Sequence, residues 1–190
     1  AWSGGETVKQ WGNLLLFLGV LLLIGAVWIQ AENKQEDQRA QHASYLALRA
    51  LETATEGLTE TVEPAEQMPV RKADGEDYVG ILSISALGLE LPVMDEWSYP
   101  KLKKVPCRYA GSILTGDLIL MAHNYESHFG NLKRLELGDE VLFEDMAGDS
   151  FSYQVTAVEA LGSGDRAELW AGEWDLTLFT CTPGGASRVV

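Results

Sequence analysis

The chain has 190 residues, enough for the core of one domain plus an appendage. Its 28 acidic and 14 basic residues give a net charge of −14, which argues against a nucleic-acid partner because so few cations cannot neutralise a phosphate backbone. The acidic residues either attract an amine-bearing acceptor or form a solvated surface, and we favour the second interpretation. Two cysteines make neither a disulfide framework nor a zinc site, so we expect both thiols to be free.

Residues 11–29, which follow a short polar lead, are apolar apart from Asn13. A helix of this length spans about 28 Å, close to the hydrocarbon thickness of a bilayer. Trp11 and Trp28 lie near its two ends, where tryptophan suits the membrane interfaces. A cleaved signal peptide is the competing interpretation, with a cleavage site around Ala31. We favour a retained membrane anchor, whose orientation the flanking Lys and Arg residues do not settle.

A helix continuing from the membrane is predicted for residues 32–56, which are rich in Ala, Glu, Gln, Leu and Arg and contain no Gly or Pro. A modest apolar stripe recurs at steps of three and four residues. Its members are Ala43, Leu46, Ala47, Ala50, Leu51 and Ala54. Three uses of this stripe are open: packing on the following domain, pairing with another chain, or extending a stalk. Residues 57–77 carry Pro64, Pro69 and several acidic residues, a composition typical of a linker.

Short strands separated by turns begin at Tyr78. Strands are predicted at 78–84, 87–93, 117–122, 140–143 and 151–160, and helical turns at 98–104, 131–135 and 166–171. The first two strands form a hairpin. Several short strands at this spacing indicate a closed or nearly closed barrel.

The last segment reads as a β-hairpin. Residues 175–181 alternate apolar and β-branched side chains, and Pro183-Gly184-Gly185 provides turn chemistry. If the two glycines form the turn, Thr182 lies opposite Ser187 and Cys181 lies near Arg188. A thiol beside a guanidinium suits a nucleophile with a fixed cation that holds a carbonyl or its oxyanion.

Residues 177–181 (Thr-Leu-Phe-Thr-Cys) followed by Arg188 resemble the TLxTC…R signature of the sortases, which are surface-anchored cysteine transpeptidases of Gram-positive bacteria. Their catalytic histidine closes an earlier strand, and His123 after residues 118–122 is similar to that pattern, with Ala122 where many sortases have glycine. The resemblance covers residues 78–190 and leans toward class B-like or class D-like members. It implies a mainly β fold, namely a sortase-type closed β-barrel with short helices. This barrel would be preceded in the chain by an N-terminal transmembrane and juxtamembrane helix.

The resemblance also assigns catalytic roles. Cys181 is the nucleophile, His123 the general base and acid, and Arg188 the electrostatic partner, since arginine keeps its proton at working pH. His128 and Arg108 are the weaker candidates for the second and third roles. The expected substrate-binding residues are Asn124, Thr180 and Thr182.

The implied reaction is cleavage of an LPxTG-like sorting motif through a thioacyl-enzyme, which an amine then resolves. The partners would be surface proteins or pilins with a C-terminal sorting motif, and an acceptor amine on a peptidoglycan precursor or a pilin lysine. We expect no cofactor and no metal. The resemblance places the N-terminus in the cytoplasm and the catalytic domain outside.

Two other functions remain open, a membrane-tethered extracellular thiol protease or hydrolase and a non-catalytic tethered β domain. The expected organisation is a lead at 1–10, an anchor at 11–29, a juxtamembrane helix at 30–56, an acidic linker at 57–77 and a catalytic domain at 78–190. We expect the final strand to be incomplete, because the sequence stops two residues after Arg188.

Overall fold

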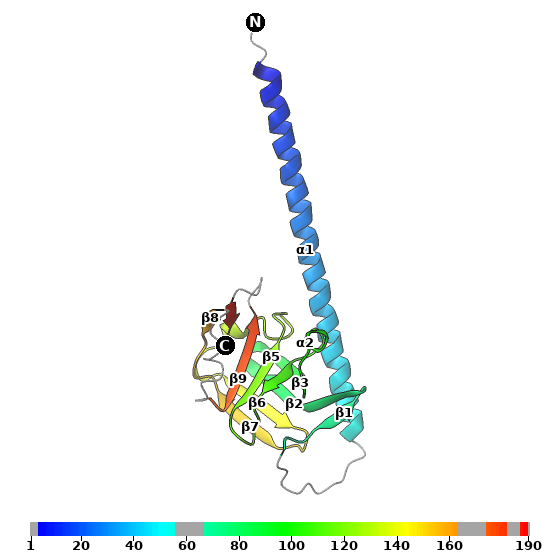
Figure 1. The fold of residues 1–190 in the computed structure, drawn as a ribbon, viewed down its shortest axis with the longest axis vertical. Coiled ribbons are helices and arrows are strands. Elements are labelled where there is room, and N and C mark those ends of the chain that lie inside the picture. Colours follow the sequence, from blue (N-terminus) through cyan, green and yellow to red (C-terminus); the bar gives the residue numbers. More distant parts are fainter. Residues whose placement is uncertain (1–3, 56–66, 163–173, 182–186, 190) are drawn as a thin grey trace. The chain divides into compact units, whose positions relative to one another are not determined.

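The computed structural model describes residues 4–55, 67–162, 174–181 and 187–189 (Figure 1). The chain divides into two compact units, residues 1–36 and residues 37–190. The predicted helix at 166–171 and the turn residue Thr182 lie outside the described residues.

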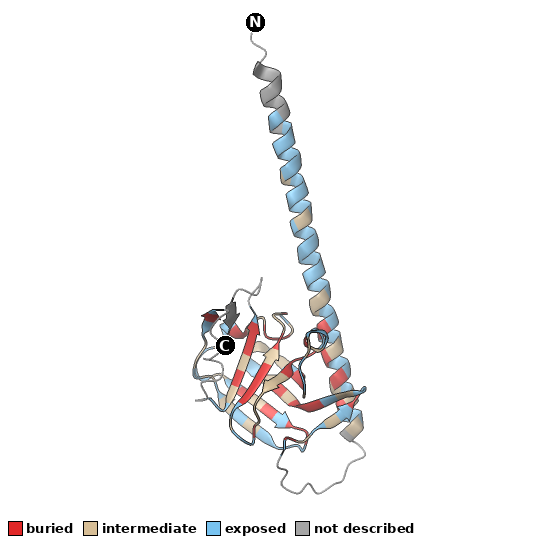
Figure 2. Ribbon diagram, in the orientation of Figure 1, coloured by how far each residue is buried: buried red, intermediate tan, exposed pale blue. Residues whose placement is uncertain are grey.

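The first unit consists of the N-terminal part of a single helix, α1 (Gly4–Thr55). The helical prediction for residues 32–56 is confirmed as far as Thr55, the last residue that the structure describes there. Within α1, one segment is long and apolar enough to cross a membrane, by length and composition. Its large side chains, Trp28 among them, are exposed (Figure 2).

The second unit is a curled β-sheet with short helical segments. The strands are β1 (Arg71–Ala73), β2 (Glu76–Ile84), β3 (Leu89–Met94), β4 (Cys107–Ala110), β5 (Leu118–Ala122), β6 (Glu140–Asp145), β7 (Ser150–Gln154), β8 (Ala160–Gly162), β9 (Leu176–Cys181) and β10 (Ser187–Val189). The helical segments are η1 (Ser85–Leu87), α2 (Tyr99–Leu102) and η2 (Leu132–Arg134).

The sheet follows the strand order β7-β6-β2-β3-β4-β5-β9-β10-β8, with β1 added beside β2. Its curl forms a half-barrel (Figure 1). The expected opening hairpin is present, because β2 and β3 pair antiparallel. Among the described strands, two neighbouring pairs run parallel, β3 with β4 and β5 with β9. The second of these pairs positions the site described below.

Three differences from the predicted elements have local causes. β1 lies in the stretch expected to be a linker. Arg71 and Lys72 interrupt any apolar alternation, so the sequence gives no strand signal there, and the strand forms through its pairing with β2. β4 was not predicted, because it is short and follows Pro106. The strand predicted at 151–160 is two strands, β7 and β8, with residues 155–159 between them.

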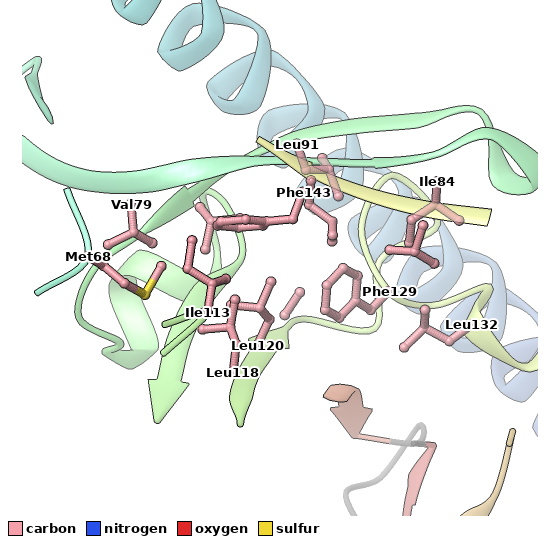
Figure 3. Close-up of a cluster of buried hydrophobic side chains, with 14 residues drawn as sticks. Met68, Val79, Ile84, Leu91, Ile113, Leu118, Leu120, Phe129, Leu132 and Phe143 are labelled. Atoms are coloured by element: carbon pink, nitrogen blue, oxygen red, sulfur yellow. The ribbon is translucent and has the colours of Figure 1, made fainter. Parts of the chain in front are cut away.

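The main core fills the concave side of the sheet (Figure 3). Its members come from β2, β3, β5 and β6 and from the segments between strands. They include Val79, Leu82, Leu91, Leu118, Leu120, Phe129, Leu132 and Phe143. Phe129 comes from the loop that follows β5 and is completely buried.

The C-terminal part of α1 packs on this domain. Ala40, Ser44, Ala47 and Leu51 are its buried positions, at steps of four, three and four residues (Figure 2). Ala47 and Leu51 join a second core cluster with Tyr78, Met94 and Cys107. Of the three uses left open for the apolar stripe, packing on the domain is the one observed. The buried face is rotated from the predicted stripe, so that it includes Ser44 and leaves Leu46 exposed.

Candidate active site

The parallel strands β5 and β9 are the framework of the site. Their register pairs Leu118 with Leu176 at one end and Ala122 with Thr180 at the other. The next residue on each strand is a predicted catalytic residue, His123 after Ala122 and Cys181 after Thr180. Neighbouring strands lie about 4.8 Å apart, so this register brings the imidazole and the thiol to the same edge of the sheet.

The alternation of side chains along a strand decides which face of the sheet His123 and Cys181 share. Leu118, Leu120 and Ala122 on β5 point into the main core. The odd-numbered positions therefore point to the opposite face, where Ile119 and Phe179 form a separate cluster. His123 and Cys181 continue the odd-numbered series, so they lie outside the barrel core, as expected for a site that receives substrate.

Thr180 joins the two strands. Its side chain is 2% exposed, and its Oγ1 donates a hydrogen bond to the Ala122 carbonyl oxygen at 2.9 Å. The contact of Thr180 with substrate stays a prediction, and its hydroxyl serves the β5–β9 pair. It thereby fixes the spacing of the two residues that follow.

His123 is half-buried and has two side-chain neighbours from its own loop. Its Nδ1 lies 3.1 Å from the Asn124 Oδ1, and its ring stacks on Tyr125 with centroids 4.4 Å apart and an interplanar angle of 6°. With Nδ1 protonated, it donates to the Asn124 oxygen, and Nε2 becomes the atom able to accept a proton. Asn124, expected to bind substrate, thus contacts the imidazole.

The two thiols have opposite environments. Both are free, and Cys181 is exposed whereas Cys107 is buried in the second core cluster. Burial raises the pKa of Cys107 to about 12, which keeps that thiol protonated at neutral pH. Of the two cysteines, Cys181 is therefore the one accessible to a substrate.

Arg188 lies directly opposite Cys181 in the antiparallel pairing of β9 with β10. This is the register that the Pro-Gly-Gly turn predicted. Arg108, the alternative arginine, is bound elsewhere: its guanidinium forms an ion pair with Asp95 at 2.5 Å and donates to the Gly111 carbonyl at 3.1 Å. Three consecutive strands, β5, β9 and β10, thus bring His123, Cys181 and Arg188 to neighbouring register positions.

Comparison with known proteins shows the family to which the fold belongs. A family model described as the Sortase domain matches residues 82–190, more than half of the chain.

The chain belongs to the sortase family.

Solved structures show the same fold. The sortase D5 transpeptidase of Clostridium perfringens is 17% identical over 80% of this chain and 94% of that chain, with a TM-score of 0.54. Sortase A from Corynebacterium diphtheriae is 17% identical over 85% and 92%, with a TM-score of 0.54. A pilus-related sortase C of Group B Streptococcus is 18% identical over 82% and 92%, with a TM-score of 0.50. No curated protein sequence matches this chain.

His128, the other candidate base of this sortase, is completely buried. Burial lowers its pKa to about 4, against an opposing effect of the Asp37 carboxylate. Its Nε2 lies 3.3 Å from the Ser44 Oγ of α1. These contacts make His128 part of the packing between α1 and the loop.

Sequence reasoning did not find the residues that surround His123. Tyr125 stacks on it, and Ser44 and Asp37 of α1 contact the same loop from more than 80 positions away. None of these three residues belongs to a sequence motif. The one local signal was the closeness of His123, Tyr125 and His128 in the sequence. Among residues 4–55, 67–162, 174–181 and 187–189, no group of three or more His, Cys, Asp or Glu residues could hold a metal ion.

Proposed function

We propose that this sortase is a cysteine transpeptidase that cleaves an LPxTG-like sorting motif and transfers the acyl group to an amine. One observation carries the proposal. Ala122 and Thr180 are paired on parallel strands, so that His123 and Cys181 follow in the same register on the face opposite the main core. A thiol beside an imidazole is the pair that nucleophilic acyl transfer requires.

The reaction would proceed in two steps. His123 accepts the thiol proton as the Cys181 sulfur attacks the backbone carbonyl of the motif, and it gives that proton to the departing amine as the C–N bond breaks, which leaves a thioacyl-enzyme. An incoming amine then attacks the thioester while His123 takes its proton. The C–S bond breaks, and the proton returns to the Cys181 sulfur. Arg188, opposite Cys181 on β10, would stabilise the negative charge on the carbonyl oxygen in both steps.

The substrates we propose are surface proteins or pilins with a C-terminal sorting motif. The acceptor would be an amine of a peptidoglycan precursor or of a pilin lysine. The apolar helix segment of α1 supports a single-pass membrane anchor, with the N-terminus in the cytoplasm and residues 37–190 outside. That location would place the site where both substrates occur.

A second function has one observation in its favour. The contact between His123 and Asn124 is the kind that orients the histidine in thiol proteases. An extracellular thiol hydrolase would form the same thioester and resolve it with water instead of an amine.

Thioester trapping tests the proposed nucleophile. Purified protein is incubated with a panel of sorting peptides, and intact-mass spectrometry measures the acyl adduct. We expect an adduct on the unmodified chain and on Cys107→Ala, and none on Cys181→Ala. An adduct that persists in Cys181→Ala and disappears in Cys107→Ala would overturn the assignment.

A further inference from the structure

The loop that carries His123 is a compact turn of residues 123–130. The Phe129 amide donates to the His123 carbonyl at 3.2 Å, and the His128 and Gly130 amides both donate to the Tyr125 carbonyl at 3.0 and 2.8 Å. A side chain at Gly130 would lie 2.5 Å from the Asn124 carbonyl oxygen, so the loop closes on itself only with glycine there. The 123–130 loop is therefore a defined unit whose position determines that of the imidazole.

One end of this loop is fixed by the core. Phe129 is completely buried beside Ile84 and Leu132 in the main core cluster (Figure 3). The other end is fixed by the hydrogen bond between Thr180 and Ala122 at the close of β5. The residues between these two points, 124–128, depend on other contacts.

The C-terminal part of α1 supplies those contacts. Asp37 Oδ1 accepts hydrogen bonds from the Ser127 amide at 2.9 Å and from the Ser127 hydroxyl at 2.6 Å. About two helical turns further along the same helix, Ser44 Oγ donates to the Lys104 carbonyl at 3.2 Å and lies 3.3 Å from His128 Nε2. A hydroxyl has one proton to donate, so with that proton on the Lys104 carbonyl the serine oxygen accepts from Nε2–H of a neutral His128.

The Ser44–His128 contact is buried, and the Asp37–Ser127 contacts are partly buried. Ser44 is 4% exposed and His128 0%. Removing one partner of a buried hydrogen bond leaves the other unsatisfied, which is destabilising. The contacts therefore hold the helix and the loop in one arrangement.

Two contacts between aromatic rings, one tilted and one stacked, connect this helix contact to the imidazole. His128 lies 5.6 Å from Tyr125 between ring centroids, at an angle of 51°. Tyr125 in turn stacks on His123 at 4.4 Å and 6°. A shift of Ser127 or His128 would therefore be passed to the His123 ring through Tyr125.

We propose that Asp37 and Ser44 of α1 are positioning residues for the reaction, which act through Ser127, His128 and Tyr125 to hold the His123 imidazole in line with Cys181. This proposal rests on the proposed function, in which His123 transfers protons. The juxtamembrane part of α1 then does more than connect the anchor to the domain, because it sets the geometry of the proton-transfer step. Misplacing a reacting group by about 1 Å can lower a rate about a hundredfold.

The test compares variants of the full chain in detergent. Asp37→Ala removes both side-chain contacts to Ser127 and leaves the backbone carbonyl of residue 37, which also lies within 3.3 Å of the Ser127 hydroxyl oxygen. Asp37→Asn keeps a side-chain oxygen that can accept both bonds. Glu52→Ala is the matched control, since it removes a carboxylate of the same helix that pairs with the exposed Arg49 at the surface. We expect Asp37→Ala to lower kcat about tenfold or more with KM for the sorting peptide within about twofold. Asp37→Asn should restore most of kcat, and Glu52→Ala should match the unmodified chain.

A second measurement, the rate of chemical modification of His123, does not depend on enzymatic turnover of a peptide. Diethyl pyrocarbonate modifies imidazoles, and peptide mapping gives the rate at His123 separately from the rate at the exposed His42. We expect Asp37→Ala to raise the His123 rate several-fold and to leave the His42 rate unchanged. If Asp37→Ala does not fold, Ser127→Ala decides the same question, because it removes only the hydroxyl contact to Asp37.

The outcomes separate the two proposals. If the unmodified chain processes no sorting peptide, the proposed function fails, and the modification rates alone confirm or refute the positioning. If it processes peptide while Asp37→Ala keeps kcat and the His123 modification rate, the positioning role is wrong and the proposed function stands. An equal loss in Asp37→Ala and Asp37→Asn would also contradict the positioning role, because asparagine retains the acceptor.

Discussion

Thr180 donates a hydrogen bond to Ala122 across two parallel strands that lie far apart in the sequence. The residue after each of them is a proposed catalytic residue. The pairing therefore sets the distance between imidazole and thiol before any substrate arrives. Preorganisation of this kind is what makes acyl transfer by a thiol efficient.

Thr180→Val tests this pairing. Valine keeps the shape and removes the donor, so the Ala122 carbonyl loses a buried partner. We expect the free energy of unfolding to fall by about 1 to 2 kcal/mol and kcat to fall with it, as measured by chemical denaturation and by peptide turnover. Thr180→Ser retains the hydroxyl and should stay close to the unmodified chain. A Thr180→Val variant with unchanged stability and turnover would show that the bond has no such role.

The two cysteines should differ sharply in reactivity. Burial raises the pKa of Cys107 to about 12, so at pH 8 it is neither ionised nor accessible. We expect one thiol per chain to react with 5,5′-dithiobis(2-nitrobenzoic acid) in the folded protein and two after denaturation, with Cys181 identified as the first by peptide mapping. Labelling of Cys107 in the folded chain would contradict its buried position.

His128 should make stability depend on pH. In the folded chain its pKa is lowered to about 4 by burial, whereas in the unfolded chain it stays near 6.5. Because the neutral form is the one that folds, the full stabilisation is present above about pH 6.5. It is lost as the pH falls toward 4, by an amount on the order of 3 kcal/mol.

Urea unfolding at pH 7, 5.5 and 4.5 measures this loss. His128→Gln should be less stable at pH 7 and should lose less stability on acidification than the unmodified chain. His42→Gln removes an exposed histidine of α1 and should keep the original pH dependence. Parallel curves for His128→Gln and the unmodified chain would contradict the prediction.

Gly130→Ala should disturb the loop itself. The added carbon would lie 2.5 and 2.7 Å from the carbonyl oxygens of Asn124 and Tyr125, which belong to the backbone and cannot move alone. We expect lower stability and a lower kcat. Gly138→Ala is the control, since its added carbon meets no atom within 4 Å and its cost is limited to backbone strain at φ +94°. Equal activity of the two variants would show that closure of the loop is not important.

Local rules predicted the pairing of β9 with β10 well. A two-residue turn at Gly184 and Gly185 predicts a register in which Cys181 faces Arg188, and the structure has that pairing. The apolar run before His123 predicted a strand that ends at Ala122, as observed for β5. Both predictions rest on neighbours in the sequence.

Contacts between distant residues were not predictable in this way. Which face of α1 is buried depends on the domain it packs against, and a serine at position 44 is buried there because it meets His128 and Lys104. No periodicity of a single helix encodes that partner. The hydrogen bond of Thr180 could not be predicted for the same reason, since its partner Ala122 lies on another strand.

The central claim is that an amine, rather than water, resolves a thioester on Cys181. The most direct measurement is mass spectrometry of the products from a sorting peptide with and without candidate amines. We predict that an effective amine raises total turnover and produces a ligated peptide at the expense of the hydrolysed one, because a thioester reacts more readily with amines and a bound amine gains effective concentration. Products that are entirely hydrolysed, with a rate and ratio unchanged by every amine, would contradict transpeptidation and favour a thiol hydrolase.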